Sequence, residues 1–109
     1  MAVSDEQIAQ IEDLFEGVGP ITTRKMFGGL GIYANGTIFA VLMSDGDLKL
    51  KGAGDMATTL DTEGWTRWTY QRDGSGKITA MPYWSLPDAL LDDPEEASAW
   101  ARRALEALA

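Results

Sequence analysis

The dipeptide Asn35-Gly36 separates two runs of residues that favour β-strands, residues 22–34 and 37–43. Both central residues of a type I′ turn need a positive φ angle, which asparagine and glycine tolerate better than other residues. Such a two-residue turn joins neighbouring antiparallel strands. The dipeptide therefore predicts a β-hairpin, and with it an antiparallel sheet at the centre of the chain.

The remaining strand signals extend this sheet. Residues 48–51 alternate leucine and lysine, which is typical of a strand with one buried face. Residues 65–70 and 78–81 are a second β-rich pair, and the glycine-containing stretch 72–77 between them predicts a hairpin loop. If residues 22–34 are taken as one long strand interrupted by glycines, these signals predict about five strands.

Helix signals lie around and between the strands. Ser4 and Gln7 have the spacing of a capping box, in which each side chain accepts a hydrogen bond from a backbone N–H group of the first turn. They predict a helix over residues 5–16. Shorter helices are expected from Asp55 through Glu63, ending at Gly64, and to about Leu91 after a cap at residues 85–88, with Pro87 in the first helical turn.

The last helix has the clearest signals. Asp93 is expected at its N-cap and Pro94 at its first position. Ser98 is expected outside its apolar stripe, which consists of Ala97, Trp100, Ala101, Ala104, Leu105 and Leu108. The element order α-β-β-β-α-β-β-α-α predicts an α+β fold, a single antiparallel β-sheet with helices packed on it, in one domain over residues 1–109.

The chain contains neither cysteine nor histidine. This composition excludes disulfides, zinc sites built from these residues, thiol nucleophiles and every catalytic triad that uses histidine. We therefore expect no cofactor, no metal site and no catalytic residue. Any chemistry would depend on carboxylates, lysine, arginine, tyrosine or hydroxyl groups.

The charge of the chain is acidic, with 17 Asp and Glu residues against 9 Lys and Arg residues and a net charge of −8. Binding of nucleic acid requires a set of cations that faces the phosphates, so no direct nucleic-acid binding is expected. Anionic membranes are disfavoured for the same reason. The N-terminus has no signal-peptide pattern, and no apolar stretch approaches the roughly 20 residues of a membrane helix. We expect a cytoplasmic protein.

Residues 24–33 contain three glycines within four positions, Gly28, Gly29 and Gly31. A phosphate-binding loop would need a helix after these glycines, whereas a strand and a hairpin turn follow here. We therefore interpret the glycines as a strand bulge or a close backbone approach. At least one of Gly28 and Gly29 is expected to have a backbone conformation that is costly for other residues.

The basic residues Arg24, Lys25, Lys49 and Lys51 are candidates for an interaction surface. If their strands share one side of the sheet, some of these side chains form a small cationic patch that suits an acidic partner. Alternatively, they are solvated charges that deter pairing at an exposed strand edge.

Aromatic residues are concentrated in the second β-rich pair and just after it. Trp68 is expected in the core, as is Trp100 of the last helix. Trp65, Tyr83 and Trp84 are candidate interaction residues, because exposed aromatic rings often dominate the binding energy of interfaces. Trp65 and Trp84 are equally compatible with the rim of the core.

The glycine-containing motif resembles the N-terminal domain of the TfoX competence regulators, on the residues Arg24, Met26, Phe27, Gly28, Gly29, Gly31 and Tyr33. Further similarity extends over nearly the whole chain, at Gly36, Phe39, Ala40, residues 48–51, Trp68, Tyr70, residues 81–87 and Trp100. The resemblance implies an α+β fold of the secretion-chaperone-like type. It also implies a regulator of competence gene transcription that acts as a co-activator rather than as an enzyme. Full-length members carry a second, helical domain after this one, which is not expected within these residues.

These observations lead to two functional hypotheses. In the first, the chain is a non-enzymatic regulatory or protein-interaction module that binds another protein or itself, most simply as a homodimer. In the second, it is a small-ligand-binding protein or enzyme that uses the aromatic cluster, with Arg24 or Lys51 holding an anion. A closed cleft with converging polar groups would favour the second hypothesis, and an open apolar patch would favour the first.

Overall fold

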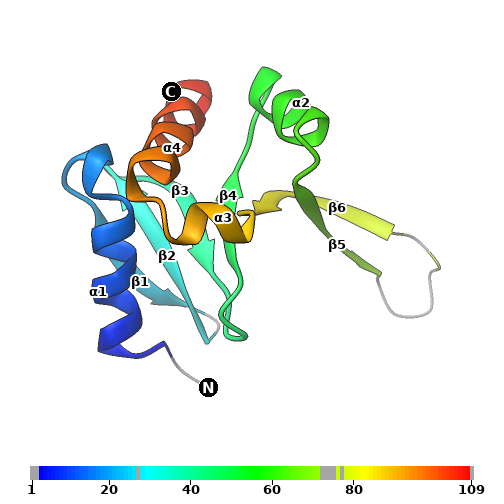
Figure 1. Ribbon diagram of the computed structural model, residues 1–109. Coiled ribbons are helices and arrows are strands. Elements are labelled where there is room, and N and C mark those ends of the chain that lie inside the picture. The colour runs from blue at the N-terminus through cyan, green and yellow to red at the C-terminus, as the bar shows by residue number, and fades with distance from the viewer. Residues whose placement is uncertain (1–2, 27, 72–75, 77, 109) are drawn as a thin grey trace.

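The chain reverses at Gly28 and again at Asn35-Gly36 in the computed structural model. The structure describes residues 3–26, 28–71, 76 and 78–108. Asn35 and Gly36 have φ angles of 51° and 80°, which confirms the expected hairpin turn. The helices and strands are shown in Figure 1 and have these bounds: α1 Asp5–Leu14, the 3-10 helix η1 Glu16–Val18, β1 Thr22–Met26, β2 Gly29–Ala34, β3 Thr37–Leu42, β4 Leu48–Lys51, α2 Asp55–Thr62, β5 Thr66–Gln71, β6 Ile78–Ser85, α3 Asp88–Leu91 and α4 Pro94–Leu108.

The six strands form one antiparallel sheet in the order β1-β2-β3-β4-β6-β5. The first four strands are neighbours along the chain. After α2, β5 forms the far edge, and β6 returns between β4 and β5. The expected α+β fold with a single antiparallel sheet is therefore confirmed.

The glycine motif forms a turn between two strands, so the expectation of one long interrupted strand was wrong. Met26 of β1 lies opposite Gly29 of β2, and Gly28 between them has a φ angle of 78°. The expectation that one of these glycines has a costly backbone conformation is confirmed at Gly28. Because strand-favouring residues lie on both sides of the glycines, the sequence pattern did not indicate this turn. The turn divides the expected strand into β1 and β2, so the sheet has six strands. Phe27 lies outside the described residues, as does most of the expected loop at 72–77.

The expected caps hold the first and last helices. The Ser4 side chain accepts a hydrogen bond from the Gln7 backbone N–H at 3.2 Å, and the Gln7 side chain accepts one from the Ser4 N–H at 2.9 Å. The Asp93 carboxylate accepts a hydrogen bond from the Glu96 N–H at 3.2 Å, at the start of α4. These bonds satisfy N–H groups that have no partner inside the helix.

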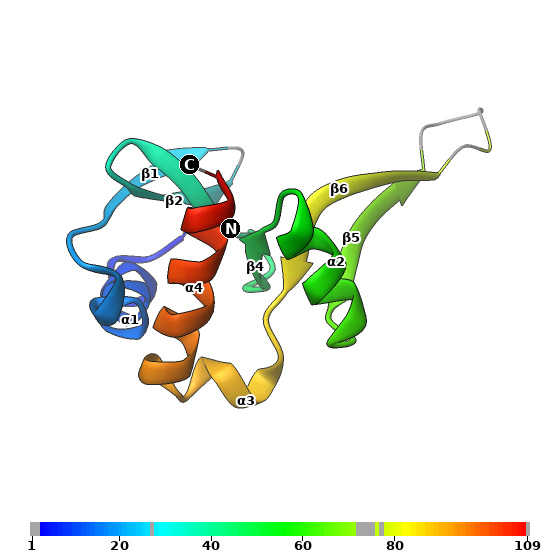
Figure 2. The same cartoon turned by 90° about the horizontal axis from the view of Figure 1, so that it is seen from above.

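The helices cover one face of the sheet and leave the other face open, as Figure 2 shows. The core lies between these layers, where the Phe15 and Phe39 rings meet edge to face with their centroids 5.2 Å apart. Trp84 of β6 is fully buried there, and its indole N–H donates to the Asp61 carboxylate of α2 at 2.7 Å. This bond satisfies the one polar group of a buried ring and holds α2 against the sheet.

The four tryptophans are distributed differently from the expectation. Trp84 and Trp65 are buried, with exposed fractions of 0% and 8%, whereas Trp68 and Trp100 are only half-buried. The expectation that Trp68 and Trp100 are the core tryptophans was therefore wrong. Trp100 packs at the border of the core, with its ring 5.0 Å from that of Trp65 and the Arg103 guanidinium 4.4 Å from its centroid.

The close packing of α4 explains why its tryptophan is displaced from the centre. The fully buried residues of this helix are small: Ala97, Ser98, Ala101 and Ala104. Ser98, expected outside the apolar stripe, donates to the Leu14 carbonyl at 3.0 Å and accepts from the Gly17 N–H at 3.1 Å. Small side chains let the helix axis approach its neighbours, which leaves room for a large ring only at the border.

We expect Trp84→Ala to lower the free energy of unfolding by about 3–5 kcal/mol, because it leaves a cavity and an unpaired Asp61 carboxylate. Trp100→Ala should cost less, since part of its ring is already in solvent. Urea denaturation of both variants measures the difference. Equal losses for the two variants would contradict this assignment of the core.

We expect Gly28→Ala to cost about 1 kcal/mol or more, because only the backbone angle opposes it. A Cβ atom at Gly28 would have its nearest neighbour, the Ser44 Cβ, at an ordinary 3.6 Å. Gly28→Asn is the matched variant, since asparagine tolerates a positive φ angle. Its loss of stability in the same denaturation experiment should be the smaller one, and an alanine variant as stable as the wild type would refute the assignment.

Candidate functional site

The open face of the sheet carries a mixed set of side chains. Residues that lie directly opposite each other on paired strands share a face, and one such row runs Arg24, Gly31, Val41, Lys49 and Ser85. The sheet curves, so that the β1–β2 and β5–β6 hairpins flank the open face (Figure 2). The open face is therefore a shallow trough between two hairpins.

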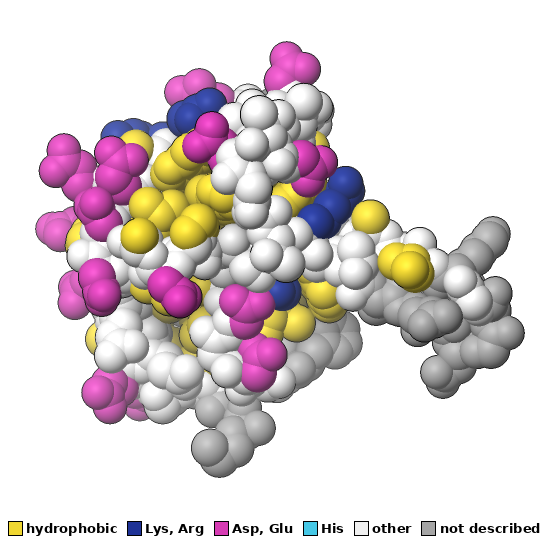
Figure 3. Space-filling view, turned by 45° about the vertical axis from the view of Figure 1, so that its right-hand side comes forward, with side chains coloured by type: hydrophobic (Ala, Val, Ile, Leu, Met, Phe, Trp, Pro, Cys, Tyr) yellow, Lys and Arg dark blue, Asp and Glu magenta, His cyan; other side chains and the backbone are white. Residues whose placement is uncertain are grey.

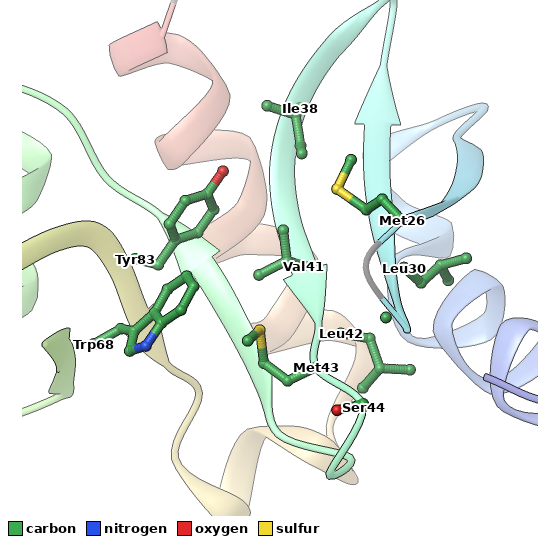
Figure 4. Close-up of a pocket in the computed structure, with 10 residues that line it drawn as sticks. Met26, Leu30, Ile38, Val41, Leu42, Met43, Ser44, Trp68 and Tyr83 are labelled. Carbon is green, nitrogen blue, oxygen red and sulfur yellow. The ribbon is translucent and has the colours of Figure 1, made fainter. Parts of the chain in front are cut away.

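A cavity of about 230 Å³ lies in this trough. We call it the sheet groove, and its lining residues are Met26, Gly29, Leu30, Ile38, Val41, Leu42, Met43, Ser44, Trp68 and Tyr83. Met26 of β1 lies on one side and Trp68 and Tyr83 of the second hairpin lie on the other, with β3 between them (Figure 4). The Trp68 and Tyr83 ring centroids are 6.0 Å apart. The groove therefore combines thioether, aliphatic and aromatic surfaces.

The glycines of β2 make room for this groove. Gly29 and Gly31 lie on the open face, opposite Met26 and Arg24 of β1. A Cβ atom at Gly31 would lie 3.0 Å from both the Met26 Cε and the Tyr33 Cε1. At Gly29, a Cβ atom would overlap the Leu42 carbonyl oxygen. Close approach of the Leu42 backbone therefore requires glycine at Gly29, as the sequence motif predicted, whereas at Gly31 a Cβ atom would press on the end of the flexible Met26 side chain and on the Tyr33 ring.

A polar network adjoins the groove on β4 and β6. Lys49 is buried, and its ammonium donates to the Asp47 carboxylate and to the Ser85 hydroxyl, the latter at 3.0 Å. Ser85 donates in turn to Asp47 at 2.9 Å, and the Lys49 Nζ lies 5.8 Å from the Trp68 ring centroid. These hydrogen bonds tie the turn before β4 to β6 beside the groove.

Tyr83 places a hydroxyl group beside the apolar lining. Burial raises the pKa of this hydroxyl above its ordinary value, and nearby Tyr33 raises it further. The Arg24 guanidinium lies 5.8 Å from the Tyr33 ring centroid. The two tyrosines and Arg24 therefore form a polar margin beside the apolar lining of the groove.

The basic candidates are only partly brought together. Arg24, Lys49 and Lys51 lie on the open face, and Lys51 is directly opposite Tyr83. Lys25 follows Arg24 in β1 and is directed to the other side of the sheet. Lys49 is held by Asp47. Arg24 and Lys51 are therefore the candidates that offer charge beside the groove.

Of the aromatic candidates, only Tyr83 lines the groove. Trp65 and Trp84 are buried on the helix-covered side and present no surface to a partner. Sequence reasoning missed Trp68, Ile38 and Met43 as groove residues. Successive residues of β6 point to opposite sides of the sheet, so Tyr83 and Trp84 lie on different faces. Only the strand order shows which of these two faces is covered by the helices.

Within the described residues, no three Asp or Glu side chains are grouped so that they could hold a metal ion. In the same part of the chain, no helix has the length and apolar character needed to cross a lipid bilayer. The polar side-chain groups that line the groove are the Tyr83 and Ser44 hydroxyls and the Trp68 indole N–H.

The fold and the groove define a small α+β domain whose sheet is covered by helices on one face and carries an apolar groove on the other. The sequence model of the TfoX N-terminal domain matches residues 13–108, so the chain belongs to this family. The resemblance noted on the glycine motif is thereby confirmed, and the chain is a competence-regulator-like domain. The TfoX N-terminal domain is not a known enzyme family. No curated protein is significantly similar to the chain in sequence.

The raised pKa of Tyr83 predicts a specific loss of stability at alkaline pH. Because the pKa of tyrosine in an unfolded chain is about 10, the unfolded protein loses this proton first as the pH rises. The stability due to the neutral hydroxyl is fully present below about pH 10 and is lost as the pH rises through the folded-state pKa.

Tyr83→Phe removes only this hydroxyl and is the matched variant. Its free energy of unfolding, measured by urea denaturation, should differ from that of the wild type by a constant amount between about pH 7 and 9. Above about pH 10 the wild type should lose stability relative to the variant. Parallel pH profiles throughout this range would refute the assignment.

Proposed function

We propose that this domain is a non-enzymatic regulatory module that binds another protein through the open face of its sheet. The observation that carries the proposal is the sheet groove, a partly open cavity with a largely apolar lining. Membership of the TfoX N-terminal domain family supports a role in the regulation of competence genes.

The chemistry of the groove suits a polypeptide surface. Tyrosine and tryptophan are the residues that most often dominate the binding energy of protein interfaces, and Tyr83 and Trp68 lie side by side here. Met26 and Met43 add flexible, polarizable side chains that adapt to the shape of a partner. An enzyme or a small-ligand site would instead be expected to enclose its ligand and to direct several polar groups at it.

Site-specific photocrosslinking in the cell that makes the protein tests this function. Ser44 is exposed and lines the groove, so a photoreactive amino acid at this position should crosslink to a discrete partner protein. The matched control is the same amino acid at Thr58, which is exposed on α2. Met43→Glu should abolish the Ser44 crosslink, because it places a carboxylate in the apolar lining.

Two outcomes would contradict the proposal. One is the absence of a discrete protein crosslinked at Ser44. The other is an equal yield of the same crosslinks at Thr58 or in the presence of Met43→Glu. Urea denaturation of each variant shows that the comparison is made between folded proteins.

A further inference from the structure

The strands and the helices of this protein carry charge of opposite sign. In the six described strands, every charged residue is basic: Arg24, Lys25, Lys49, Lys51 and Arg67. Acidic residues lie instead in the helices and turns, and Figure 3 shows them spread over the helix-covered side of the molecule. Although the net charge of the chain is −8, the charged residues of its described strands are all positive.

Two of these cations lie beside the sheet groove. Arg24 is two residues from Met26 in β1, so both side chains are on the open face. Lys51 of β4 lies directly opposite Tyr83, which lines the groove. In the described part of the chain, Lys49 and Asp47 form the only ion pair, so no carboxylate there holds Arg24 or Lys51.

We propose that the occupant of the sheet groove is an acidic amphipathic segment of another protein. Bulky apolar side chains of the segment occupy the groove, and carboxylates beside them reach Arg24 and Lys51. This inference rests on the proposed function and adds the chemistry of the partner. Charge complementarity of this kind selects partners and speeds association more than it adds affinity.

A second copy of the chain is a poorer occupant of the groove. In an isologous dimer the same patch of both copies is buried, so the Arg24 and Lys51 side chains of both copies would be brought to one interface. On the open face the Asp47 carboxylate is already held by Lys49 and Ser85, and the other described acidic residues lie in helices and in connecting segments. Contact between the open face of one copy and the helices of the next would be heterologous, which generates rings or open chains instead of a two-fold dimer.

Nucleic acid is also a poorer occupant. Affinity for nucleic acid depends on several cations that replace counterions along the phosphate backbone. The open face offers Arg24 and Lys51. The methionine and aliphatic side chains between these two cations would make no favourable contact with phosphates. An occupant with carboxylates at its margin and apolar side chains at its centre matches both features.

Fluorescence anisotropy with three labelled 14-residue peptides tests the inference directly. The first has leucine and phenylalanine on one helical face and glutamate on the other. In the second, lysine replaces every glutamate, and in the third, serine replaces every apolar residue. We expect the wild-type chain to bind the first peptide at least tenfold more tightly than the other two.

Charge-reversal variants assign the binding to the margins of the groove. Arg24→Glu and Lys51→Glu should each weaken binding of the acidic peptide about twofold to tenfold, as expected for exposed ion pairs. Lys25→Glu is the matched control, because it makes the same charge change in the same strand on the opposite face. It should leave the affinity within about twofold of the wild type.

Met43→Glu separates this inference from the proposed function. It should remove binding of the acidic peptide, because its carboxylate enters the groove lining. If the lysine peptide binds as tightly as the acidic peptide and Met43→Glu removes that binding, the groove is a binding site but the acidic partner is wrong. If Met43→Glu leaves the binding of every peptide unchanged, both the inference and the groove function are wrong.

Two further measurements address the other occupants. The chain could prove to be a dimer in sedimentation equilibrium that Met43→Glu dissociates and the acidic peptide does not. The occupant of the groove would then be a second copy, which would overturn the inference. Displacement of the labelled acidic peptide by a short DNA duplex at about 0.15 M salt, with loss of duplex binding in Arg24→Glu, would also overturn it. The inference is supported if the chain is monomeric and the DNA duplex does not displace the labelled acidic peptide.

Discussion

The open face of this domain depends on two positions in β2 that carry no side chain. At Gly29 the Leu42 carbonyl oxygen occupies the space of a Cβ atom, and at Gly31 the Met26 and Tyr33 side chains come within 3.0 Å of where a Cβ atom would lie. The missing side chains let β3 approach β2 closely and leave room for Met26 on the open face. Because the glycines also follow the turn at Gly28, one short motif both reverses the chain and shapes the groove beside it.

The buried and exposed sides of the sheet are linked through β6. Trp84 points to the helices and is fixed by its hydrogen bond to Asp61, whereas Tyr83 points to the groove. Successive residues of a strand face opposite sides, so the burial of Trp84 determines the direction of Tyr83. The packing of α2 therefore contributes to the geometry of the groove, although α2 lies on the far side of the sheet.

The partition of charge follows from the secondary structure. Carboxylates stabilise helix starts by capping N–H groups and by complementing the helix dipole, as Asp93 does at α4. Lysine and arginine in strands keep long aliphatic stems against the sheet and their charges in water, and they deter unwanted pairing at edges. As a result, the open face of an acidic protein presents the cations Arg24 and Lys51, which the net charge alone does not indicate.

The sequence by itself determined the features that depend on contacts between residues close along the chain. These are the Asn35-Gly36 turn, the caps at Ser4 and Asp93, and a backbone conformation costly for other residues at one of Gly28 and Gly29, which the structure places at Gly28. Their energetics involve only a few neighbouring residues. It also indicated the α+β class, because the elements and their order follow from local patterns.

Only the tertiary structure decided which side of each strand is covered. The return of β6 between β4 and β5 buries Trp84 and leaves Trp68 beside Tyr83, the reverse of what the aromatic pattern suggested. The same pairing places Arg24 and Lys51 beside one groove, from segments far apart in the chain. Strand order depends on the packing of all the elements together, and no local pattern contains that information.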